Sequence, residues 1–181
     1  SNFSQYAAEG GASPKGIAPR PGQIVCGDID MYIDKNGIWY YHGSPIGRKE
    51  LVKLFATVLR RDEAGEYWLI TPAEMARIRV EDAPFLAIEL STTGDGSNQA
   101  ISLRTNIDKI VKVDGDHPLR VDIDSETLEP SPYVVLDSNL EAKLVRSVYY
   151  ELVSLGVEEW VGEKQIYGVW SNGDFFPIGS L

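Results

Sequence analysis

The sequence predicts an α+β protein of two tandem, related halves, each a small mainly antiparallel sheet or partial barrel with one amphipathic helix. Short runs rich in Ile, Val, Tyr and Trp alternate with turn residues along the chain, as is typical of strands. Helical periodicity is confined to one stretch in each half. An Asn-Gly turn followed by Pro-Ile-Gly occurs near both ends, which suggests an internal duplication.

The first half begins after an irregular arm. Residues 1–23 are rich in Gly and Pro and lack periodicity, so we expect no regular element there. The segment "IDMYIDKNGIWYYHG" predicts a hairpin that turns at Asn36-Gly37. A helix is expected over residues 48–61, with an apolar stripe of Leu51, Leu54, Phe55, Val58 and Leu59. The segments "YWLITP" and "MARIRVEDAPFLAIEL" then predict about three strands, which completes a first subdomain of residues 24–90.

The second half, residues 91–181, opens with a polar segment, Ser91–Ala100, that we interpret as a linker or long hairpin loop. The segments "ISLRTN", "KIVKVDG", "LRVDIDS" and "PYVVLD" predict strands. A second helix is expected from residue 138 or 139 to 155, with an apolar stripe of Leu140, Leu144, Val148, Leu152 and Leu155. Gly156 follows where a C-cap glycine is common.

Composition excludes several classes of protein. The chain has 17 Lys+Arg against 27 Asp+Glu, a net charge of −10, which lacks the basic excess that nucleic-acid binding requires. No apolar run approaches the roughly 18 residues of a membrane helix, and no signal-peptide pattern opens the chain, so we expect no membrane partner. The single cysteine, Cys26, excludes an intramolecular disulfide and favours a cytoplasmic location. One cysteine and two histidines are too few ligands for a structural zinc site. We expect neither a metal nor a cofactor.

Several segments resemble an uncharacterised bacterial family known only as a domain of unknown function. They are "CGDIDMYI", "GSPIGRKELVKLFATVLRRDEAGEYWLITPAEMARIRVEDAPFLAIEL", "RTNIDKIVKVDGDHPLRV" and "YVVLDSNLEAKLVRSVYYELV". The resemblance covers residues 26–181 and implies an α+β fold built from a repeated motif, with a pleckstrin homology-like second half. It also implies a role in signal transduction and a nucleotide-type ligand in the cleft between the halves, and it assigns no reaction.

The stretch "YHGSPIGRKELVKLF" leads from a strand through a glycine turn into a helix, as anion-binding loops often do. Its spacing matches neither the Walker A loop nor G-x-G-x-x-G. Capping and packing of the helix start explain the stretch equally well. Arg48 opposes the positive end of the helix dipole, so we expect it to have an acidic partner, either a ligand or a carboxylate of the chain.

The candidate ligand-binding residues combine guanidinium and amide donors with one stacking face: Arg48, Arg77, Arg104, Asn106, Arg146 and Trp170. Each has a structural alternative. Arg146 is placed mid-helix at the border of the apolar stripe, where an internal ion pair is also expected. Trp170 would stack on a base or pack in the core.

The resulting hypothesis is a non-catalytic sensor or adaptor in signal transduction that binds a small anionic, nucleotide-like ligand where the halves meet. One alternative is a protein–protein interaction module without a small ligand. The other is a metal-dependent hydrolase that uses paired carboxylates two residues apart on one strand face, namely Asp28/Asp30 and Asp122/Asp124, whereas Glu81-Asp82 is interpreted as a hairpin corner.

Overall fold

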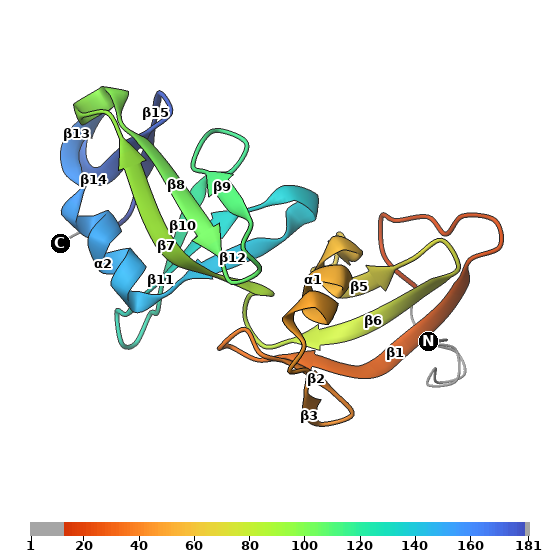
Figure 1. The fold of residues 1–181 in the computed structure, drawn as a ribbon. Coiled ribbons are helices and arrows are strands. Elements are labelled where there is room, and N and C mark those ends of the chain that lie inside the picture. The colour runs from red at the N-terminus through yellow and green to blue at the C-terminus, as the bar shows by residue number, and fades with distance from the viewer. Residues whose placement is uncertain (1–12, 180–181) are drawn as a thin grey trace. The chain divides into compact units, whose positions relative to one another are not determined.

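The structure, a computed structural model, describes residues 13–179, which form two compact units (Figure 1). The first unit extends to Pro84 and includes Ser138–Leu140, and the second contains Phe85–Asp137 and the chain from Glu141 onward. The division falls just before strand β7 (Phe85–Thr93), so the boundary expected between residues 90 and 91 lies inside that strand. Residues 13–23 contain no helix or strand, as expected, and the rest of the predicted arm, 1–12, lies outside the described residues.

The first unit is a six-stranded sheet with strand order β3-β2-β1-β6-β5-β4 and one helix. Its elements in chain order are β1 (Ile24–Ile33), β2 (Trp39–Tyr41), β3 (Ser44–Pro45), α1 (Lys49–Thr57), β4 (Leu59–Arg61), β5 (Tyr67–Ile70) and β6 (Glu74–Val80). The predicted hairpin is β1–β2, and β1 pairs in parallel with β6 on its other side. The other strand pairs of this sheet are antiparallel.

The second unit has a six-stranded sheet, a helix and a further three-stranded sheet. The larger sheet, in order β10-β11-β12-β7-β8-β9, contains β7, β8 (Ala100–Thr105), β9 (Ile110–Lys112), β10 (Leu119–Ile123), β11 (Pro130–Val135) and β12 (Glu141–Leu144). After it come α2 (Arg146–Ser154), β13 (Val157–Val161), β14 (Lys164–Ser171) and β15 (Asp174–Pro177). Short 3₁₀ turns lie at Gly96–Asn98 and Asp137–Asn139.

The two larger sheets share one topology. When the six strands of each unit are counted in chain order, both sheets run third, second, first, sixth, fifth, fourth. In both, the first and sixth strands form a parallel pair at the centre. This agreement supports duplication of the sheet. The repeated Asn-Gly turns do not mark it, because the second turn joins β14 to β15 in the additional sheet.

Both predicted helices are too long, because the predicted range of each includes residues that form a strand. The first helix ends at Thr57, and Leu59–Arg61 instead pairs with β5. The second begins only at Arg146, because Glu141–Leu144 forms β12 between β11 and β7. Leu140, Ala142 and Leu144 are buried at every second position, the period of a strand rather than a helix.

Gly156 is required for a different reason from the predicted C-cap. Its φ is not positive, so the left-handed conformation of a C-cap glycine is absent. A Cβ at this position would lie 2.3 Å from the ring of Tyr167, whose hydroxyl donates to the carbonyl of Val153 at 2.5 Å. The glycine therefore lets β14 approach the end of α2.

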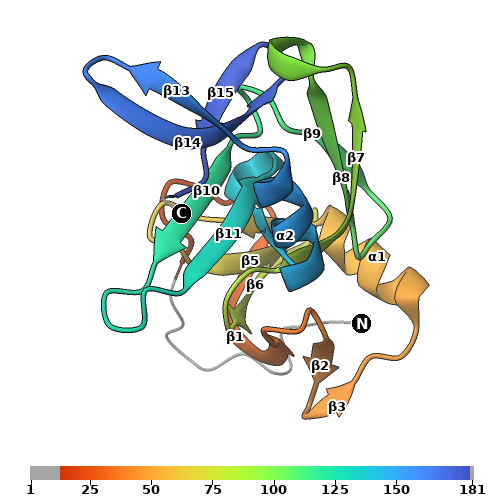
Figure 2. The ribbon, with the colours of Figure 1, turned by 90° about the vertical axis from the view of Figure 1, so that its left-hand side faces the viewer.

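The helices differ in how far they are buried. Helix α2 lies against β7 and β14 (Figures 1 and 2) and buries Val148 and Leu152. In α1 no residue is fully buried, although the ring of Phe55 stacks on the buried Trp39 at 6.2 Å. Among residues 13–179, no helix has the length and apolar character needed to cross a bilayer.

Candidate functional site

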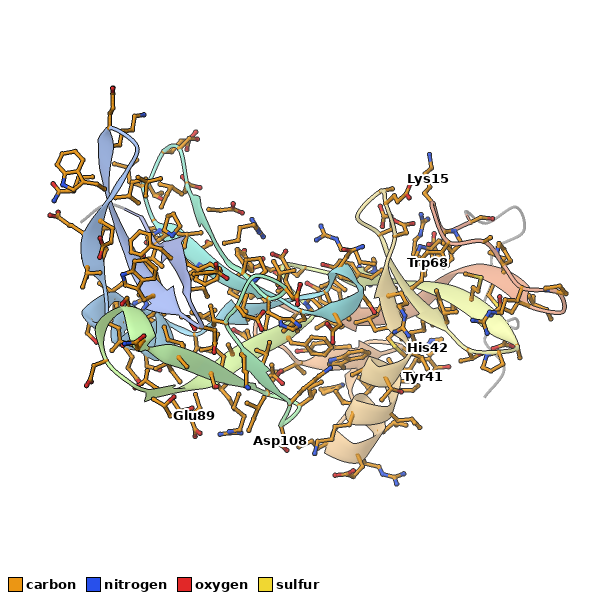
Figure 3. The ribbon with its side chains drawn as sticks, turned by 90° about the horizontal axis from the view of Figure 1, so that it is seen from above. Lys15, Tyr41, His42, Trp68, Glu89 and Asp108 are labelled. Carbon is orange, nitrogen blue, oxygen red and sulfur yellow. The ribbon has the colours of Figure 1, made fainter. Side chains whose placement is uncertain are left out.

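The N-terminal arm is anchored by Asp62, a buried residue in the loop between β4 and β5. One carboxylate oxygen accepts hydrogen bonds from the backbone N–H of Lys15 and the indole N–H of Trp68, both at 3.0 Å. The other accepts from the backbone N–H of Ala64 at 3.0 Å and of Glu66 at 2.9 Å. Figure 3 shows Lys15 and Trp68 close to one another. Asp62 therefore joins arm, loop and sheet.

The environment of Asp62 keeps it ionised. Burial alone would raise the pKa of its carboxyl, but the hydrogen bonds from Lys15, Glu66, Trp68 and Ala64 outweigh burial and lower it. Because the folded-state pKa lies below the ordinary value of 3.8, this contribution to stability is present above that pH. It is lost as the pH falls through the folded-state pKa.

Gln23 fixes the other end of the arm. Its side-chain amide donates to the carbonyl of Thr71 at 2.7 Å and accepts from the backbone N–H of Arg20 at 2.6 Å. The backbone N–H of Ile24 then donates to Ala73 at 2.8 Å, where β1 begins. The segment between Lys15 and Gln23 is thus held at both ends against the sheet.

A pocket of about 460 Å³ lies between this arm and the sheet. Apolar side chains and two arginines line it: Ile17, Ala18, Arg20 and Gln23 from the arm, and Arg60, Ile70, Thr71, Pro72 and Met75 from the sheet and its turns. We call it the arm pocket. Its volume is in the range of small-molecule sites, which are mostly apolar with a few polar groups.

The two arginines of the arm pocket have no acidic partner in the part of the chain that the structure describes. Arg60 donates to the backbone carbonyl of Leu59 at 2.8 Å and weakly to that of Thr57 at 3.4 Å, which leaves most of its five N–H donors available. Within residues 13–179 neither Arg20 nor Arg60 forms an ion pair. Both guanidinium groups therefore keep N–H donors that no carboxylate of residues 13–179 uses.

Two of the predicted arginines are instead paired with carboxylates. Arg77 makes a two-point contact with Asp28, 2.9 Å at one of the two bonds, and lies 5.8 Å above the Trp68 ring. The hydrogen bond from Arg77 lowers the pKa of Asp28. Arg104 bonds Glu89 at 3.2 Å and Asp108 at 3.1 Å, the two acids labelled in Figure 3. Both arginines therefore form ion pairs within the chain, which is the structural alternative to ligand binding.

The predicted amide and indole are also engaged. Asn106 accepts from the backbone N–H of Leu86 at 3.1 Å through its side chain and donates its own backbone N–H to Leu86 at 2.9 Å. Trp170 donates its indole N–H to Glu159 at 3.1 Å, and its ring lies 5.2 Å from that of Phe175. Both residues therefore hold strands of the second unit together.

Arg48 and Arg146 remain without carboxylate partners among the described residues, and both are exposed. Arg48 is the N-cap of α1, where its side chain makes no capping bond. Arg146 begins α2 instead of lying mid-helix, so the predicted position at the border of an apolar stripe is wrong. Each arginine thus lies at a helix start, where the positive end of the helix dipole disfavours a cation.

Three carboxylates of the hydrolase alternative pair with basic side chains, and Asp124 accepts from the backbone of its own turn. Asp28 binds Arg77, Asp30 lies 3.7 Å from both Arg79 and His42, and Asp122 binds Arg120. In the part of the chain that the structure describes, no three His, Cys, Asp or Glu side chains form a group suited to a metal ion. Burial, followed by the charge of Glu74, raises the pKa of the Cys26 thiol, which opposes the thiolate that nucleophilic catalysis needs.

In the second unit, His117 links two turns through two acids. Its Nδ1 lies 3.0 Å from Asp114, in its own turn, and its Nε2 lies 3.0 Å from Asp137, just after β11. Lys109 lies 4.0 Å from the other oxygen of Asp137. The hydrogen bond to Asp137, with that to Asp114, raises the pKa of His117 above the ordinary value of 6.5 despite burial.

The second unit should lose stability as His117 deprotonates. A raised pKa means that the contribution is fully present below about pH 6.5 and lost as the pH rises through the folded-state value. We expect His117→Gln to lower the free energy of unfolding at pH 6 and to have a smaller effect at pH 9. Urea unfolding at the two pH values measures this difference. An equal loss at both would contradict the charge-dependent link.

The fold defines a class of protein with two tandem α+β units, each built on a six-stranded sheet of the same topology. Family models describe this arrangement: the C-terminal domain of a protein of unknown function, DUF1285, matches residues 84–178, and the N-terminal domain matches residues 21–83. The chain belongs to the DUF1285 family.

Two solved structures of this family resemble the chain. A DUF1285 family protein from Silicibacter pomeroyi is 35% identical, with a TM-score of 0.78 over 97% of this chain and 91% of that one. Another from Shewanella baltica is 30% identical, with a TM-score of 0.56 over 70% of this chain and 91% of that one. No curated protein matches the chain significantly.

Proposed function

We propose that this DUF1285 protein is a non-catalytic, cytoplasmic sensor or adaptor in signal transduction that binds a small organic anion of nucleotide-like chemistry. The observation that carries the proposal is the arm pocket, whose lining combines apolar side chains with Arg20 and Arg60, neither of which has an acidic partner among residues 13–179. Apolar groups such as Ile17 and Met75 would contact the body of the ligand, and the arginines its phosphate or carboxylate.

The arm gives this pocket a means of responding to its ligand. Asp62 and Gln23 fix the segment that carries Ile17 and Arg20, so occupancy of the pocket would further stabilise the arm against the sheet. A change in arm order is a signal that a second protein could detect. Exposed Arg48 and Arg146 remain candidates for further anion contacts, and a pleckstrin homology-like second unit remains part of the proposal.

A thermal-shift screen of the full chain tests the binding step, with inorganic phosphate, nucleoside monophosphates and citrate as probes at millimolar concentration. We expect at least one organic anion to raise the melting temperature more than phosphate does, because the apolar lining adds contacts that phosphate cannot make. If no probe stabilises the protein, the proposal fails.

The matched variants are Arg60→Gln and Arg79→Gln. Arg79 is an exposed arginine of the same unit that lies outside the arm pocket, 5.0 Å from the Tyr32 ring. We expect Arg60→Gln to weaken binding about tenfold or more through loss of a charge-assisted contact, and Arg79→Gln to leave it unchanged. Equal effects of the two substitutions would indicate general charge attraction instead of a site.

A further inference from the structure

Strand β13 is an open edge of the three-stranded sheet in the second unit. The sheet order is β13-β14-β15, and within the described residues β13 pairs only with β14. Figure 2 shows β13 on the outer side of its hairpin with β14. An unpaired strand of this kind can accept another strand through its backbone.

The register identifies the backbone groups that face outward. Val161 pairs with Lys164 around a two-residue turn, so this pair exchanges hydrogen bonds within the hairpin. Bonding and non-bonding pairs alternate along an antiparallel ladder, which directs the N–H and C=O of Glu158 and Trp160 away from β14. The open edge therefore presents donors and acceptors at alternate residues, as an added strand requires.

The side chains at this edge are apolar and acidic. Val157, Trp160 and Val161 are 41%, 69% and 50% exposed. Acidic residues Glu158 and Glu163 lie beside them, also exposed. Charged residues at an edge are a common protection against aggregation, but that role gives no reason to expose a tryptophan. Trp160 lies on the same face of β13 as Glu158, whereas Val157 and Val161 lie on the other face, and an exposed aromatic beside an acid is typical of a binding contact.

Charge disfavours a second copy paired about the strand centre and favours a basic partner. If two copies of β13 paired antiparallel about the strand centre, Glu159 would lie opposite Glu159 of the copy, and like charges directly opposite destabilise a sheet. A basic strand would place opposite charges there instead. A basic segment also suits a chain whose net charge is −10.

We propose that the open edge of β13 binds an extended, basic segment of a partner protein as a fourth strand, with Trp160 contacting an apolar side chain of that segment. The segment would bond to the backbone of Glu158 and Trp160, and its lysines or arginines would face Glu158 and Glu163. This surface is separate in sequence and in unit from the arm pocket, so either can fail without the other.

Titration of the full chain with a short peptide of repeating Lys-Lys-Val-Val tests the proposal, followed by backbone amide NMR shifts; the repeat places a lysine and a valine two residues apart, opposite Glu158 and Trp160 on one face. We expect binding with shifts concentrated at residues 157–163 and about tenfold weaker binding for Trp160→Thr. The matching peptide of repeating Glu-Glu-Val-Val should not bind. Equal binding of the two peptides, or shifts elsewhere, would overturn the proposal.

Two further variants distinguish the contribution of the β13 backbone to peptide binding from the contribution of its side chains. Glu158→Pro removes an outward-facing N–H, a change that an edge strand tolerates, and should abolish binding while the melting temperature is kept. If it unfolds the unit, Glu158→Lys replaces it and should weaken binding of the lysine peptide about tenfold through charge repulsion. Unchanged binding in the folded variant overturns the proposal, as does dimerisation through β13 in sedimentation.

Discussion

Asp62→Asn is expected to destabilise the first unit by about 2–4 kcal/mol, because it replaces a buried acceptor of four hydrogen bonds with a group that is half donor. The new amide N–H₂ must face either Lys15 and Trp68 or Ala64 and Glu66, which are donors in both cases. The loss should appear as a lower urea midpoint at pH 7.

The pH dependence and a control make this prediction specific. The difference between wild type and Asp62→Asn should shrink as the pH falls below 3.8, where the depressed pKa of Asp62 is approached and its charge is lost. Glu63→Gln, an exposed neighbour in the same loop, should change stability by no more than about 0.5 kcal/mol. Equal effects of the two substitutions would contradict the role assigned to Asp62.

Arg120→Ala is expected to destabilise the second unit by about 3–5 kcal/mol, because it removes the arginine that bonds the buried side chain of Glu141. Arg120, on β10, bonds both oxygens of Glu141, on β12, at 2.8 and 2.9 Å. Its guanidinium passes over β11, 4.4 Å from the Tyr133 ring. One side chain therefore links three adjacent strands.

The double variant Arg120→Met/Glu141→Gln tests whether the penalty comes from the lost pairing of Glu141 with Arg120. It removes both charges while keeping similar volume, so it should be less destabilised than Arg120→Ala alone. Chemical unfolding of the full chain followed by near-ultraviolet circular dichroism measures both. A double variant that loses more than the single variant would contradict this explanation.

Local patterns predicted most strands of the fold because their signals are short-range. The Asn36-Gly37 turn lies between β1 and β2 as expected, and the apolar runs of the second half became β8 to β11. The helices were overextended because apolar residues at 140, 144 and 148 fit a helical stripe and a strand equally well. Pairing of Glu141 with Arg120, 21 residues away, decided for a strand.

The candidate site was harder to predict because its residues acquire their roles from distant partners. Arg77 and Arg104 were recognised as donors, but Asp28 and Glu89, which neutralise them, come from other strands. Arg20 lies in a segment interpreted only as irregular. Nothing local shows that Asp62 and Gln23 fix that segment beside Arg60.

The most direct test of the central claim is to map the amide shifts of the full chain during titration with a nucleoside monophosphate. We predict saturable shifts at residues 17–23, 60 and 70–75, which line the arm pocket, and their loss in Arg60→Gln but not in Arg79→Gln. Saturable shifts confined to other residues, or none at millimolar ligand, would contradict the assignment of this pocket as the anion site.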